Sequence, residues 1–110
     1  MSGGHYDYKQ YHIQEIAENI QEQLNRQGKL KPKEELWMSR EYYIEYPEEK
    51  SYPFYPEDVQ KVMKDAVIIL RKAYVYAQRI DWYLSGDDGD ETFIERLEEE
   101  LSDLKRNNEI

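Results

Sequence analysis

The sequence contains no cysteine, and only five of its 110 residues are glycine and four are proline. Without cysteine the chain has no disulfide, no thiolate ligand for zinc and no cysteine nucleophile. The longest apolar run, residues 66–70, is far shorter than the roughly 20 residues that a membrane-spanning helix needs. The first five residues lack the basic and apolar regions of a secretory signal peptide. We therefore expect a soluble cytoplasmic protein with no membrane association.

Basic residues are also few relative to acidic ones. The chain has 15 Lys and Arg against 24 Asp and Glu, a net charge of −9, which argues against direct binding to duplex nucleic acid. The acidity is concentrated at one end, because residues 85–104 hold nine acids and one base while residues 1–84 are nearly balanced. We expect this acidic segment, rather than the chain as a whole, to set any charge preference for a partner.

Helical periodicity is the strongest pattern that is present. After Pro56, a heptad seam runs through one long segment, at Val59, Met63, Ala66, Leu70, Ala73, Ala77, Ile80 and Leu84. At about 1.5 Å per residue this helix would be roughly 40 Å long, too long for the remaining segments to cover. The sequence therefore predicts a long central helix that packs against a second copy of the chain.

Shorter helices are predicted on both sides of it. Asp7 and Gln10 fit a capping box that opens the first helix, and Gly28 fits its end. A short helix is expected between Pro32 and Pro47, and a last helix is expected to open with a capping box at Thr92. The predicted fold is an all-α single domain over residues 1–110, a helical-bundle homo-oligomer of about four helices per chain. Residues 46–56 are expected to form an ordered proline-rich and aromatic loop, and residues 107–110 a frayed tail.

The candidate ligand-binding residues lie on a stripe of the long helix and at the beginning of the chain. A stripe that alternates base and aromatic can give cations to an anionic ligand and a stacking surface to a base. Its tyrosines can equally complete the core while the basic side chains extend past them to solvent. Residues near the start of the chain are expected to fold over the ligand. The predicted set is Lys72, Tyr76, Arg79 and Tyr83 with His5, Tyr6 and Tyr8.

Metal and enzyme chemistry receive little support. Residues 85–91 contain four acids, but their spacing is not that of an EF-hand, so we expect a helix connection rather than a calcium or magnesium site. His5 and His12 have no third ligand at a suitable spacing. The chain shows no nucleophile elbow and no phosphate-binding glycine loop. We therefore predict no catalytic residue, no metal and no cofactor.

Two segments resemble a group of short, uncharacterised proteins that phages and prophages encode. They are Gly-Gly-His-Tyr-Asp-Tyr-Lys-Gln-Tyr-His-Ile at 3–13 and Tyr-Ala-Gln-Arg-Ile-Asp-Trp-Tyr-Leu-Ser-Gly-Asp-Asp-Gly at 76–89. The resemblance supplies no functional residues. It implies a setting, since small phage accessory proteins often act against host defence.

Two functional hypotheses follow. In the first, the oligomer sequesters a nucleotide-type immune signalling molecule without catalysis. In the second, the acidic segment 85–104 imitates nucleic acid and binds a host defence or nucleic-acid-binding protein directly. A phage structural or regulatory adaptor is a third reading. We favour the first, because an oligomer built on the long helix would create pockets between subunits.

Overall fold

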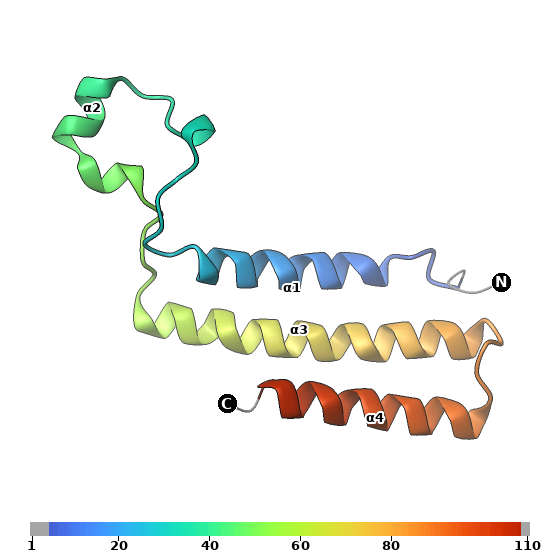
Figure 1. Cartoon of the computed structure of the whole chain (residues 1–110). Helices are drawn as coiled ribbons and strands as arrows, with labels where there is room; N and C mark the ends of the chain where they lie inside the picture. Colours follow the sequence, from blue (N-terminus) through green and yellow to red (C-terminus); the bar gives the residue numbers. More distant parts are fainter. Residues whose placement is uncertain (1–4, 109–110) are drawn as a thin grey trace.

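The structure is a computed structural model that describes residues 5–108, and over this range it is all-helical (Figure 1). It contains no strand in this range beyond an isolated antiparallel bridge between Leu30 and Ser51. The prediction of an all-α chain with four helices is therefore confirmed. The α-helices are α1 Gln10–Asn25, α2 Arg40–Glu45, α3 Glu57–Leu84 and α4 Asp90–Asn108, and two short 3₁₀ helices occupy Lys33–Glu35 and Pro47–Lys50.

Three of the helices form a single layer. Helix α3 lies in the middle, with α1 along one side and α4 along the other, and neighbouring helices run in opposite directions (Figure 1). The molecule measures 64 × 31 × 16 Å, and its smallest dimension is little more than the width of one helix with its side chains. One chain therefore forms an open layer, whereas the sequence predicted a helical bundle.

The core of this layer is small. Its buried apolar residues are Ala17, Leu24, Val67 and Val75, and a further buried residue, Tyr43, lies in α2 outside the layer. The accessible surface is 8340 Å², whereas a compact protein of this mass exposes about 6,500 Å². The radius of gyration is 19.7 Å, against about 13 Å for a compact chain of this length. A single chain thus leaves an unusual amount of surface in contact with water.

The long helix is observed where the sequence placed it. Pro56 precedes α3 as its N-cap rather than as its first residue, and Glu57 and Asp58 lie in the first turn, where carboxylates favour the positive end of the helix dipole. The helix ends at Leu84, and Gly86 follows with a φ of 85°, a conformation that glycine adopts without strain. The predicted seam is covered only in part, since six of its eight residues are partly buried. Val59 and Leu84 of that seam are exposed.

The predicted start of the first helix is wrong. Lys9 is the N-cap of α1 and its side chain makes no capping bond, while Asp7 and Tyr8 have φ values of 54° and 62°. Gln10 is not free to complete a capping box, because its side chain is buried against α3. A tertiary contact has replaced the local one that the sequence suggested. The helix ends at Asn25, before Gly28.

Residues 26–56 form an arm that extends from one end of the layer (Figure 1). The N–H of Gly28 donates to the carbonyl of Tyr52, and the N–H of Tyr52 donates to the carbonyl of Lys29, so the arm closes on itself at its base. Its α-helix is shorter than expected, and Ser39 caps it by accepting the N–H of Tyr42. Part of the predicted aromatic loop, Pro47–Lys50, is a 3₁₀ helix. The ring of Phe54, elsewhere in this loop, is largely exposed.

The last helix begins two residues earlier than the predicted capping box at Thr92. Helix α4 continues to Asn108, so residues 107 and 108 of the predicted frayed tail are helical, and residues 109–110 lie outside the described range. Among the described residues, no helix is long and apolar enough to span a membrane.

Candidate ligand-binding groove

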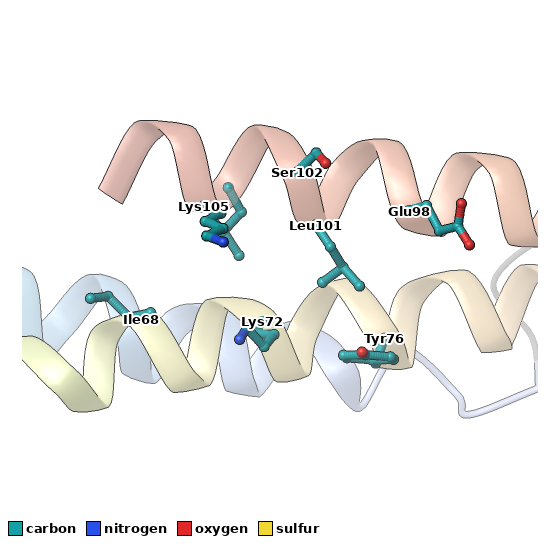
Figure 2. A pocket seen from close by; sticks show the side chains of 8 residues that line it. Ile68, Lys72, Tyr76, Glu98, Leu101, Ser102 and Lys105 are labelled. Carbon is teal, nitrogen blue, oxygen red and sulfur yellow. The ribbon is translucent and has the colours of Figure 1, made fainter. Parts of the chain in front are cut away.

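A groove of about 670 Å³ runs between α3 and α4. Figure 2 shows Leu101 of α4 pointing toward α3 near Lys72 and Tyr76, with Glu98 and Lys105 to either side of it. The lining residues come from successive turns of two antiparallel helices, so their helical spacing brings them to one surface. They are Ile68, Lys72 and Tyr76 of α3, and Glu98, Leu101, Ser102, Leu104 and Lys105 of α4.

The lining combines an apolar floor with charged and polar groups. Three aliphatic side chains supply the floor, at Ile68, Leu101 and Leu104. Two ammonium groups, one carboxylate, a serine hydroxyl and an exposed tyrosine ring surround it. Such a surface fits a ligand that has a flat apolar body and a negative charge.

Arg79, which the sequence suggested as an anion ligand, is part of a charge network instead. Its guanidinium pairs with Glu100 of α4, and lies 3.5 Å from Asp88 in the connection before α4. Asp88 is also paired with Arg96 at 3.0 Å. The guanidinium of Arg79 lies over the ring of Trp82, 4.7 Å from its centre. This cation therefore ties α3 to α4, and it does not line the groove.

Tyr83 is also engaged within the chain. Its hydroxyl donates a hydrogen bond to Asp90 at 2.5 Å, and its ring packs against Phe93 with 4.9 Å between centres. The hydrogen bond to the carboxylate raises the pKa of Tyr83, because it stabilises the protonated phenol. Of the four residues in the predicted stripe, Lys72 and Tyr76 line the groove, while Arg79 and Tyr83 hold the start of α4 in place.

The acidic connection between α3 and α4 owes its geometry to these contacts. Asp88 accepts from Arg96 and faces Arg79, and Asp90 accepts from Tyr83. Within residues 5–108, no three histidine or carboxylate side chains come together in a way that could hold a metal ion.

The residues near the start of the chain, which were predicted to fold over the ligand, pack on the side of α3 that is opposite the groove. The backbone N–H of Tyr6 donates to Asp81 at 3.0 Å, and the rings of His5 and Tyr6 meet edge to face. The ring of Tyr8 stacks on that of Tyr11. A second depression of about 410 Å³ lies here, lined by residues 5–13 and by Ala77. The structure therefore does not bring His5, Tyr6 and Tyr8 to the groove that contains Lys72.

A buried polar cluster holds these N-terminal residues against α3, and the sequence did not predict it. Asp81 is fully buried, and its carboxylate accepts from the N–H of Tyr6 and, at 3.1 Å, from the side chain of Gln10. The Gln10 amide also donates to Gln78 at 2.7 Å, and Gln78 donates to the hydroxyl of Tyr11. The available signal was positional, since Gln78 and Asp81 share the face of α3 that carries the buried Val67.

Comparison with protein-family models, with curated proteins and with solved structures finds no match for this chain. We therefore infer a function from the geometry of the groove and of the helical layer.

Proposed function

We propose that this protein is a non-catalytic binding protein that holds a small anionic, nucleotide-like ligand in the groove between α3 and α4. The observation that carries the proposal is the combination in one groove of Lys72, Lys105 and the exposed ring of Tyr76 above an aliphatic floor. Each part matches one part of a nucleotide, since ammonium groups pair with phosphate and an aromatic ring stacks on a base.

Size and energy both suit such a ligand. Small-molecule sites commonly measure about 300–1,000 Å³, and this groove falls within that range. Stacking of a base on an aromatic side chain contributes about 1–3 kcal/mol. The apolar floor adds the burial of the ligand's own carbon atoms. Glu98 makes one part of the groove unfavourable for an anion, so we place the phosphate beside the lysines and away from this carboxylate.

The net charge of −9 does not oppose this assignment. Charges separated by more than about 8–10 Å in water are largely screened at physiological ionic strength, so the lining residues dominate the potential in the groove. Glu98 is the acid among these lining residues, against two lysines.

The resemblance to short phage proteins supports a biological role for the ligand. We propose that the protein removes a nucleotide-type immune signal from solution, and so protects a phage from host defence. This role needs tight binding and no chemical step.

The test is calorimetric titration with cyclic dinucleotides and ADP-ribose derivatives. We expect at least one of them to bind, and we expect Lys72→Ala and Tyr76→Ala to weaken its binding at least tenfold. Lys64→Ala is the matched control, because Lys64 is an exposed lysine of the same helix that does not line the groove. Absence of binding across the panel, or equal affinities for the Lys72 and Lys64 variants, would contradict the proposal.

A second candidate function is direct inhibition of a basic host protein, and α4 supplies the observation that favours it. Glu91, Glu95 and Glu99 are exposed and are spaced four residues apart, so about 6 Å of helix separates one from the next. A row of carboxylates at this spacing resembles a strand of phosphates and can occupy a groove that binds nucleic acid. In this case a host protein would be captured by the unmodified chain in a salt-sensitive way, and Glu95→Gln with Glu99→Gln would abolish the capture.

A further inference from the structure

We propose that the open face of α3 is the interface with a second copy of this chain, so that two helical layers stack face to face. The positions on this face follow one another at helical spacing for the whole length of the helix, and none of them is charged. They are Val59, Val62, Ala66, Ile69, Leu70, Ala73, Ala77, Ile80 and Leu84. In a chain in which 35% of residues are charged, an uncharged face of this length indicates a buried role.

The neighbouring helices cover this face only in part: five of its residues are partly buried and four are exposed, namely Val59, Val62, Ile69 and Leu84. The side of α3 toward α1 carries the buried residues Gln78 and Asp81, and the side toward α4 carries Arg79. The face between them remains partly open, because three helices in one layer leave the two surfaces of the layer uncovered (Figure 1). Val62 and Ile69 are 67% and 64% exposed, and Leu84 is 49% exposed.

The amount of excess surface indicates how large the missing cover is. The chain exposes about 1,800 Å² more than a compact protein of its mass. Part of this excess belongs to the extended arm of residues 26–56, so about 3,700 Å² is the upper limit of what two copies could bury in total; obligate homodimers bury about 2,000–5,000 Å². A stable domain also normally has two packed layers around its core, whereas one chain supplies only one.

The pattern of side-chain sizes favours a copy of the same chain, in antiparallel orientation. If the two-fold axis passes near residue 71, Ile69 lies opposite the partner's Ala73, and Val62 lies opposite the partner's Ile80. At the Ile69–Ala73 pair a large side chain then meets a small one, which allows close packing of the helices, and the helix dipoles oppose each other favourably. Tyr76 borders both this face and the groove, so the second copy would add a wall to the groove. The interface itself does not depend on any ligand.

The test is sedimentation equilibrium of the full chain at micromolar concentration. We expect a particle of twice the chain mass of 13.4 kDa. Ile69→Glu and Val62→Glu should each give a monomer that retains its helical circular dichroism, because both side chains are exposed within a single chain. Ile44→Glu is the matched control, since Ile44 is 69% exposed on α2, away from this face, and the variant should remain dimeric.

Three results would overturn the proposal. They are a monomeric mass for the unmodified chain, a dimer that both glutamate variants leave intact, and dissociation by the Ile44 variant alone. If the glutamate variants unfold, cross-linking in the cysteine-free background decides the matter. Ile69→Cys chains mixed with Ala73→Cys chains should form disulfide-linked heterodimers in preference to either homodimer. Preferential homodimers of the Ala73→Cys chain would contradict the antiparallel interface, and absence of any cross-link would contradict the interface itself.

Discussion

The substitution Arg79→Ala should destabilise the protein by loosening α4. The side chain of Arg79 is 13% exposed and that of its partner Asp88 is 3% exposed, so removal of the guanidinium leaves a buried carboxylate with less compensation. Removing one member of a fully buried ion pair costs about 3–5 kcal/mol. Two features reduce this cost here, because Glu100 is 40% exposed and Arg96 still pairs with Asp88. We therefore expect a loss of about 2–3 kcal/mol in the free energy of unfolding.

Urea denaturation followed by circular dichroism measures this loss of unfolding free energy. In thermal unfolding, the same substitution should lower Tm by about 8–12 °C in a domain of this size. Arg96→Ala is the control. Its side chain is 55% exposed, so the loss should stay below about 1 kcal/mol although it contacts the same carboxylate. The double substitution Arg79→Ala with Asp88→Ala should cost less than the sum of the two single substitutions. Equal and small losses for Arg79→Ala and Arg96→Ala would refute the assignment of Arg79 as the tie between α3 and α4.

Three further predictions concern the buried carboxylate of Asp81, Gly28 at the base of the arm of residues 26–56, and the partly buried Tyr74. Asp81→Asn should cost about 1–3 kcal/mol in a denaturant titration, because the new amide places a donor where the carboxylate accepts two N–H groups. Gly28→Ala and Gly86→Ala should each destabilise by about 1–2 kcal/mol because both glycines have positive φ, and at Gly28 the new Cβ should also displace the exposed ring of Phe54. Burial raises the pKa of Tyr74 above its ordinary 10.0, so its contribution to stability is complete below pH 10 and is lost as pH rises through the folded-state pKa. Tyr74→Phe should therefore flatten the alkaline fall in stability, as thermal unfolding above pH 10 would show.

The helices that the sequence predicted well are those with long, repeated patterns. The 28 residues of α3 repeat their apolar spacing often enough that no single contact can change the assignment. The start of α1 depended on one local motif. There the buried carboxylate of Asp81 holds Gln10 and the backbone of Tyr6, so a contact between distant parts of the chain decided the local geometry. Helical spacing puts Asp81 on the buried face of α3, but it does not show which residues of α1 this carboxylate holds.

The candidate site could be predicted in part, because helical spacing shows which residues of one helix share a surface. Helical spacing correctly indicated that Lys72 and Tyr76 share a surface, and both line the groove. It does not indicate which acids of α4 and of the connection before it lie opposite, so the pairing of Arg79 with Glu100 and Asp88 could not be foreseen. Lys105 reaches the groove from α4, and its part in the site depends on the register of two antiparallel helices, which the sequence does not specify.

The hydrophobic periodicity of the sequence also could not predict that one chain forms an open layer. A heptad seam shows that a helix face is apolar, but it does not say whether another helix of the same chain or a second molecule covers it. In this structure the seam residues Val59 and Leu84 remain exposed.

The measurement that tests the proposed function most directly is an NMR titration of the ¹⁵N-labelled protein with the nucleotide that binds most tightly in the calorimetric panel. If the groove between α3 and α4 is the binding site, the amide signals of Lys72, Tyr76, Ser102 and Lys105 should shift with a common saturation curve. The signals of residues 5–13, on the opposite side of α3, should change little. Shifts confined to residues 5–13, or a titration that leaves all signals in place, would contradict the assignment of the groove as the ligand site.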